Sequence, residues 1–176
     1  MTVTDHNGAE QLGHALEDFQ VGDVFYHWPG RTVTDYDNML ATFFTVNPSS
    51  LHFDSLVAER AGHPGLLVNG GLVLMIVHGL TVRDISSAPP AIVHLGFDRV
   101  RMHKPTYGGD TLYAMSKVTD VRESASKPDR GIVTVHTVGV NQRKEKVISF
   151  DRAVMVYKRD FVPEEPPIVS WAQIED

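Results

Sequence analysis

The sequence has no cysteine among its 176 residues, which excludes a disulfide framework, a thiolate zinc site and a cysteine nucleophile. This composition is compatible with a reducing compartment, and we expect the protein in the cytoplasm. Basic residues are also few, 16 against 22 acidic ones, and the net charge is −6. Because no sequence-wide basic surface can hold a phosphate backbone, we do not expect nucleic acid as a partner.

Long hydrophobic runs and phosphate-binding glycine loops are missing as well. The longest apolar run, Gly70 to Leu80, is far shorter than the ~20 residues of a membrane span. The N-terminal residues lack the basic start and apolar stretch of a secretory signal. No glycine-rich dinucleotide or P-loop motif follows a predicted strand. We therefore expect no membrane partner and no Rossmann or P-loop enzyme, and we interpret the apolar run as a buried core helix.

Strand and helix signals alternate in the first half of the chain. Aromatic and β-branched residues predict a first strand over 24–34. Thr34, with Asp37 three positions later and apolar residues at helical spacing, predicts a capped helix over 35–46. Asp54 or Ser55 can cap a second short helix. The apolar helix follows over 71–80.

Four long β-branched segments make up most of the second half, and turn clusters separate them. They cover residues 91–103, 110–123, 131–140 and 146–158, and we expect a consecutive antiparallel meander. A strand, an apolar helix and then four strands predict an α+β fold, in which a curved antiparallel sheet wraps around a central helix. This is the hot-dog arrangement. It leaves an edge strand exposed, so we expect a homodimer, a dimer of dimers or a trimer of dimers.

We expect one domain without internal repeats. Residues 1–19 are predicted to be a mobile N-terminal lead-in, and residues 20–160 the hot-dog domain. Residues 161–176 are rich in Pro and Glu, which excludes a central strand. We expect a tail there, with Trp171 as an anchor on the body or on a neighbouring subunit.

The chemistry is concentrated in the stretch Phe44 to Asp54, FTVNPSSLHFD, and in Leu67 to Gly70, LVNG. These residues resemble the MaoC-like (R)-specific enoyl-CoA hydratase family, whose motif runs Gly-Asp-x-Asn-Pro-Leu-His-x-Asp and continues with Val-His-Gly. The interval of 18 residues from His52 to Gly70 also agrees with that pattern. The resemblance covers about residues 20–158.

The resemblance implies syn addition of water across the 2,3 double bond of an enoyl-CoA. In this family an Asp and a His hold and deprotonate the water, while a backbone N–H at a helix mouth polarises the thioester carbonyl. The His corresponds to His52 and the helix-mouth glycine to Gly70, but Asn47 stands in place of the Asp. Since an amide cannot take a proton, His52 would be the main base and Asn47 would orient the water. CoA is then part of the substrate, and neither a cofactor nor a metal is implied.

Two further departures point to a branch of the family. Ser49 replaces the usual Asn of the loop, and Asn69 replaces the His before Gly70. The chain most resembles the branch that handles small branched or dicarboxylic acyl groups, the mesaconyl-CoA and itaconyl-CoA hydratases, and we expect Ser49 and Asn69 to contact substrate. An acyl carboxylate favours an Arg partner. Arg99 and Arg101 are candidates, predicted to share one face of a strand that points to the pocket or to solvent.

Other functions remain open at this point. A hot-dog thioesterase needs a carboxylate at the thioester carbon, for which Asp54 is the nearby candidate. A non-catalytic acyl-CoA-binding subunit is compatible with Asn47, and a partner chain would then supply the full catalytic pair. Asn47 can also be no more than a helix stop before Pro48, and Gly70 a packing glycine. We expect His78 in the core or at an interface, and the strand histidines lack metal-ligand spacing and receive no role: His27, His94, His103 and His136.

Overall fold

The computed structural model describes residues 13–164. The first part of the predicted lead-in and most of the predicted tail, including Trp171, lie outside the described residues. Among residues 13–164, no helix is both long and apolar enough to cross a membrane.

Five antiparallel strands form one sheet in the order β1-β3-β4-β5-β2. Their bounds are Val24–Thr32 for β1, Ala91–Met102 for β2, Thr111–Glu123 for β3, Arg130–Asn141 for β4 and Lys146–Tyr157 for β5. The predicted meander is correct for β3, β4 and β5 but wrong for β2, which pairs with β5 at the far edge of the sheet. The link from β2 to β3, residues 103–110, is longer than a tight hairpin turn and carries the chain across the end of the sheet.

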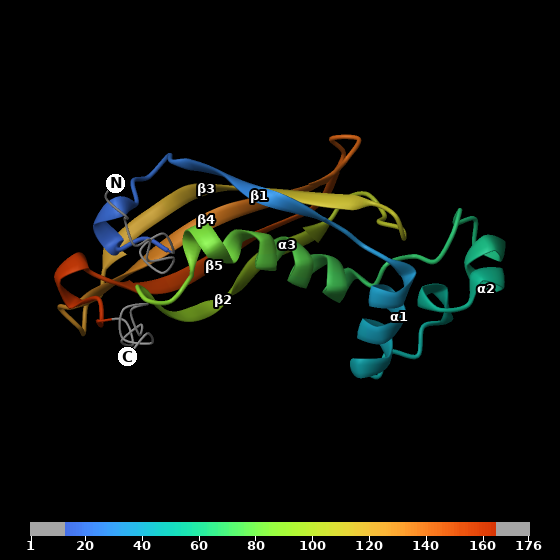
Figure 1. Ribbon diagram of the computed structural model, residues 1–176, viewed down its shortest axis with the longest axis horizontal. Helices are drawn as coiled ribbons and strands as arrows, with labels where there is room; N and C mark the ends of the chain where they lie inside the picture. The colour runs from blue at the N-terminus through green and yellow to red at the C-terminus, as the bar shows by residue number, and fades with distance from the viewer. Residues whose placement is uncertain (1–12, 165–176) are drawn as a thin grey trace, which may run out of the picture.

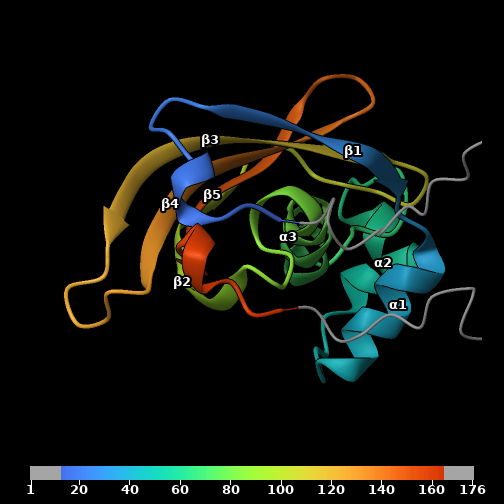
Figure 2. The same ribbon diagram turned by 60° about the vertical axis from the view of Figure 1, so that its left-hand side comes forward.

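The sheet curves around one long helix, α3, as the hot-dog arrangement requires (Figure 2). α3 spans Gly70–Ile85 and so continues beyond the predicted end at residue 80, because Thr81 and Ile85 are also buried. Sheet and helix approach closely at Gly139, where a Cβ atom would lie 2.7 Å from a methyl carbon of Val77. This contact explains why a glycine stands near the C-terminal end of β4.

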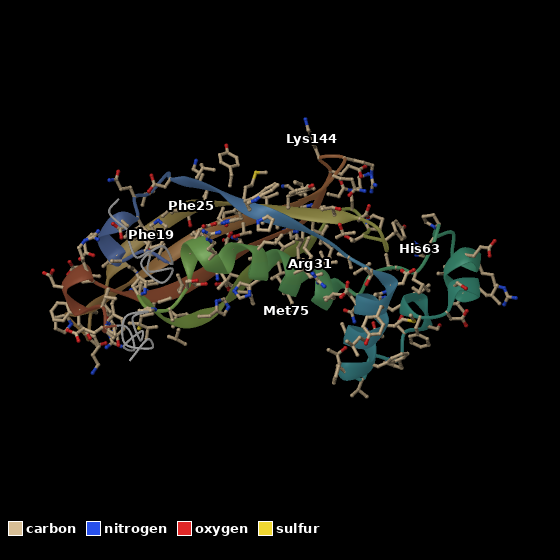
Figure 3. The ribbon with its side chains drawn as sticks, in the orientation of Figure 1. Phe19, Phe25, Arg31, His63, Met75 and Lys144 are labelled. Atoms are coloured by element: carbon tan, nitrogen blue, oxygen red, sulfur yellow. The ribbon has the colours of Figure 1, made fainter. Side chains whose placement is uncertain are left out.

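One side of α3 is not buried in this chain. Gly71, Met75, Gly79 and Arg83 follow one another at four-residue spacing and are all exposed, Met75 by 48%. Met75 lies on the side of the helix that faces away from the sheet (Figure 3). The prediction of a fully buried core helix is therefore wrong for this stripe, since the single chain provides only one covering layer.

Two short helices lie beyond the end of the sheet, next to the N-terminus of α3 (Figure 1). α1 spans Asp35–Phe44 and α2 spans Ser55–Arg60, with the predicted caps: Thr34 forms a capping box with Asp37, and Asp54 caps α2. α1 ends two residues before its predicted end because Val46 adopts a left-handed backbone conformation with φ of 54°. Local capping chemistry thus determines both starts.

The N-terminal residues that the structure describes pack against the opposite end of the sheet. Leu16, in the short 3₁₀ helix Leu16–Asp18, and Phe19 are buried in a cluster with Ile85 and residues of β3, β4 and β5. The expected mobile lead-in is therefore wrong for this stretch, because two large apolar side chains at a three-residue spacing are removed from water.

A polar cluster lies between the sheet and the middle of α3. Arg152 on β5 is 1% exposed, and its Nη1 donates to His78 Nε2 at 2.8 Å. Burial lowers the pKa of Arg152 to about 10 and, together with the Arg152 charge, that of His78 to about 4. Burial also lowers the pKa values of His94 and of His27, although Asp84 partly offsets the shift of His27. His78 is thus a core histidine, as predicted.

We expect the free energy of unfolding to decrease as the pH falls from 6.5 towards about 4. In this pH range His78 is protonated in the unfolded chain but stays neutral in the folded one, so acid favours unfolding. For this group the free energy of unfolding falls by on the order of 3 kcal/mol at pH 4. Urea unfolding at several pH values measures the effect. His78→Gln retains an acceptor for Arg152 but does not titrate, so it should flatten the pH dependence. An equal slope in both proteins would contradict the assignment.

Candidate active site

A cavity of about 420 Å³ lies at the N-terminus of α3. Its wall is built from the 3₁₀ helix Ser50–His52, the segment 63–68, the first turns of α3, and residues 102–106 that follow β2. The predicted pair His52 and Gly70 both line it, together with the apolar side chains of Val73 and Met102. The fold therefore brings these two residues, 18 positions apart in the sequence, to the same cavity.

His52 is held in one orientation and one tautomer. Its Nδ1 atom lies 2.7 Å from the Leu67 carbonyl oxygen, which can only accept, so Nδ1 carries the proton. The lone pair of Nε2 is then free to take a proton from a water molecule. An imidazole fixed in this way has the form that general-base catalysis requires.

Asn38 in α1 holds the loop that carries His52. The side chain is fully buried, and its Nδ2 donates to the carbonyl oxygens of His52 and Leu67, both at 3.0 Å. Its Oδ1 accepts the N–H of Asn69 at 2.8 Å. One amide thus joins α1, the His52 turn and the start of α3. Sequence reasoning missed this residue, since a lone Asn within an amphipathic helix carries no local signal of such contacts.

Asn38→Ala is expected to lower the free energy of unfolding by about 2–4 kcal/mol, because it removes three hydrogen bonds at a buried site. The His52 carbonyl and the Asn69 N–H lose their partner, and the Leu67 carbonyl keeps only the bond from His52 Nδ1. Urea unfolding measures the change. Thr45→Ala at the exposed end of α1 serves as the control, with an expected change within about 1 kcal/mol. A loss for Asn38→Ala no larger than that of the control would show that the three contacts contribute little.

Gly70 occupies the first position of α3, where a backbone N–H has no partner within the helix. Asn69 is the N-cap, and its Oδ1 accepts the N–H of Gly71 at 2.9 Å. A Cβ atom at Gly70 would lie 3.6 Å from Met102 Cε, so its absence is not required by packing. The glycine keeps the cavity open beside the positive end of the helix dipole, which favours negative charge on a bound carbonyl oxygen.

The other predicted site residues lie outside the lining of this cavity. Asn47 accepts the N–H of Ser49 at 3.0 Å and so closes a turn after α1. Asn69 lines a different, apolar cavity of about 300 Å³ beside α1. Arg99 and Arg101 lie on β2 and do not share a regular alternation, since the register with β5 shifts there and Arg99 has φ of 51°. Arg99 instead forms an ion pair with Asp151.

Three basic side chains line the cavity without having been predicted. His63 Nδ1 lies 3.1 Å from the Tyr107 hydroxyl, and His103 Nε2 lies 2.8 Å from Ser149 Oγ. Lys104 follows at the same rim, and Figure 3 shows His63 at the same end of the molecule as α2. His103 and Lys104 are distant from His52 in sequence, so only the tertiary structure brings them to this cavity. Among residues 13–164, no three His, Asp or Glu side chains form a group that can hold a metal.

The fold and this site define a hot-dog module of the MaoC-like type. Residues 1–167 match the family model described as mesaconyl-CoA hydratase. The chain belongs to that family.

Curated relatives and solved structures agree with this assignment. The chain is 39% identical over 153 residues to a β-methylmalyl-CoA dehydratase of Chloroflexus aurantiacus, a match that covers 84% of the chain and 41% of the relative. It is 34% identical to a mesaconyl-CoA hydratase of Cereibacter sphaeroides, over 88% of the chain and 44% of the relative. A solved MaoC-domain protein from Chloroflexus aurantiacus superimposes with a TM-score of 0.80 at 37% identity, over 91% of this chain and 45% of that one.

A second structure shows the fold alone. A Mycobacterium tuberculosis protein with a double hot-dog fold superimposes with a TM-score of 0.73 at 22% identity, over 89% of this chain and 47% of that one. The chain also spans less than half the length of the curated relatives named above.

Proposed function

We propose that the protein hydrates, or forms by dehydration, a short 2-enoyl-CoA with a branched or dicarboxylic acyl group of the mesaconyl-CoA or itaconyl-CoA kind. The observation that carries this proposal is the shared cavity of His52, with its Nε2 lone pair free, and the first N–H of α3 at Gly70. The names of the related hydratases and dehydratases support the acyl class. The thioester is the substrate, and we propose no cofactor or metal.

The chemistry uses two ends of the cavity. His52 Nε2 takes a proton from water, and the water oxygen adds to C3 of the enoyl group. Negative charge then develops on the thioester oxygen, where the Gly70 N–H and the helix dipole stabilise it. His52 then delivers this proton to C2, so that the two parts of one water molecule have added to C3 and C2. Asn47 is proposed to orient the water from the turn that follows α1. Ser49, Asn69, Arg99 and Arg101, which lie outside the lining of this cavity, are proposed to contact parts of the substrate that extend beyond it.

The thioesterase alternative is not favoured by the position of its candidate carboxylate. Asp54 Oδ1 accepts the N–H groups of Leu56 at 3.0 Å and Val57 at 3.2 Å, as the N-cap of α2. The residue is also absent from the cavity lining. Its role is thus explained by helix capping.

The decay of the enone absorbance with crotonyl-CoA, mesaconyl-CoA and itaconyl-CoA tests the function, with free thiol measured in parallel. Loss of the enone signal without thiol is the expected result. Thiol release would support the thioesterase. If neither signal changes, the binding-subunit alternative is supported instead.

A second hot-dog module is the proposed partner, supplied by another copy of this chain. β2 is an edge strand with four exposed apolar side chains, each 43–50% exposed: Val93, Leu95, Val100 and Met102. Such an edge favours pairing with another strand, and the curated relatives are more than twice the length of the match. We also propose the cytoplasm as the compartment, on the grounds of the composition.

Light scattering is expected to return a mass of at least twice the 19.5 kDa of one chain. Replacing Val93 and Leu95 with Lys adds charge to the β2 edge and should shift the mass towards the monomer. Replacement with Lys at two exposed positions of β3, Thr119 and Asp120, is the control. A strictly monomeric wild-type chain would overturn the proposal.

A further inference from the structure

A second cavity lies towards the C-terminal end of α3, whereas the His52 cavity lies at its N-terminal end. Figure 1 shows the two ends of this helix. The volume of the second cavity is about 290 Å³, and its wall comes from the last turns of α3, the following loop and the start of β2. Three polar side chains line it, His78, Ser86 and His94, and neither Asp nor Glu does. We call it the Arg152 pocket, because Arg152, which does not itself line the cavity, contacts His78 and Ser86.

Arg152 is a buried cation without a carboxylate partner among the described residues. The side chain is 1% exposed, and its Nε and Nη2 atoms find no acceptor in residues 13–164. Two acidic residues of the neighbouring elements have other partners: Asp151, next to it in β5, binds Arg99 and His136, and Asp84 in α3 binds His27. A buried charge is costly unless an opposite charge and hydrogen bonds compensate it.

The contacts of Arg152 make its neighbours into donors. Its Nη1 lies 2.8 Å from His78 Nε2 and 3.1 Å from Ser86 Oγ, and a guanidinium can only donate. His78 therefore carries its proton on Nδ1, and the Ser86 hydroxyl proton is left for another acceptor. His94 has no partner at either ring nitrogen within the described part of the chain, and one of the two carries a proton.

Two backbone carbonyls near the C-terminus of α3 accept hydrogen bonds from N-terminal residues. The Arg83 carbonyl accepts the N–H of Gly13 at 3.1 Å, and the Asp84 carbonyl accepts from His14 Nδ1 at 2.7 Å. The pocket thus combines hydrogen-bond donors, a positive charge behind them and an apolar remainder that includes Val82 and Val154.

We propose that the Arg152 pocket binds the carboxylate of a small organic acid. A carboxylate accepts several hydrogen bonds, and its negative charge compensates the positive charge of Arg152. The volume is sufficient for an acid of four or five carbons but small for a nucleotide.

The carboxylate has two possible sources, and the geometry of β2 favours one. Ala91 to His94 line the Arg152 pocket, whereas Met102 at the other end of β2 lines the His52 cavity. Two copies paired through β2 by a twofold axis run antiparallel, so the Met102 end of one copy lies beside the Ala91 end of the other. In that dimer the pocket of one copy serves the acyl carboxylate bound to the other, a step that rests on the proposed function.

The binding itself is tested by calorimetric titration of the full chain with free mesaconate, which needs no catalysis. We expect saturable binding that Arg152→Met weakens by at least ~10-fold and Ser86→Ala by about 5-fold. The control is Arg122→Met, which removes an exposed arginine of β3 and should leave the affinity unchanged. His94→Phe preserves the ring packing against Phe97 and should also weaken binding, so the test remains if Arg152→Met fails to fold. Absence of binding to the wild type, or equal affinity in all variants, overturns the proposal.

Steady-state kinetics then identify the source. If the acyl group supplies the carboxylate, Arg152→Met raises KM for mesaconyl-CoA by at least ~10-fold and leaves KM for crotonyl-CoA unchanged. If a free acid is the ligand, both KM values stay the same while the affinity for mesaconate falls. If no thioester is hydrated at all, the proposed function is wrong, and the mesaconate titration alone decides the pocket.

Discussion

His52→Ala is expected to lower kcat for enoyl-CoA hydration by ~10²-fold or more, since a positioned general base contributes about 10²–10⁴-fold. The contacts of His52 indicate that this substitution changes catalysis without changing the fold. Within the described part of the chain the imidazole makes one hydrogen bond, from Nδ1 to the Leu67 carbonyl, and His52 lines the cavity. The decay of the enone absorbance under saturating substrate gives kcat directly.

His52→Asn is the matched variant for this prediction. The Asn side-chain N–H₂ can take the place of Nδ1 as the donor to the Leu67 carbonyl, but nothing replaces Nε2. We therefore expect wild-type stability in urea together with the same loss of kcat. Activity that survives in His52→Asn would make His52 a structural residue and would remove the base from the mechanism. Asn47→Ala should cost less than either variant, because an orienting amide does not accept the proton.

Gly70→Ala is expected to lower kcat/KM by about 10²-fold without loss of stability. The added Cβ atom meets Met102 at ordinary van der Waals distances of 3.6 and 3.8 Å, so the protein itself accommodates it. A bound thioester is displaced by the same methyl group from the N–H that polarises its carbonyl, and small displacements of this kind have large effects on rate. Kinetics and urea unfolding on the same variant separate the two effects.

Gly79→Ala provides the control on the same helix. Nothing lies within 4 Å of a Cβ atom at Gly79, which is exposed and lines none of the three cavities described above. We expect an increase in the free energy of unfolding by about 1 kcal/mol, as for other glycines replaced within helices, and unchanged kinetics. Equal kinetics in Gly70→Ala and Gly79→Ala would show that the Gly70 N–H does not contact the substrate.

Local elements and the central pair of the site follow from short stretches of sequence. Helix caps and turn residues act over a few residues, so the caps Thr34 and Asp54 were predictable. The alternation of β3 is equally local, since every second residue from Leu112 to Val118 is buried. The motif placed His52 and Gly70 together because each is defined by its immediate neighbours along the chain.

Strand pairing and the rest of the site depend on contacts between segments that are far apart in the chain, and these contacts are visible in the folded structure alone. Sequence order did not reveal that β2 pairs with β5, since strand pairing is a choice between surfaces far apart in the chain. The same holds for Asn38, which joins three segments through one buried amide, and for His63 and His103 at the cavity wall. Arg152 is the extreme case. On a strand of alternating residues it is indistinguishable from a surface arginine, and only the helix packed over it makes it a buried cation.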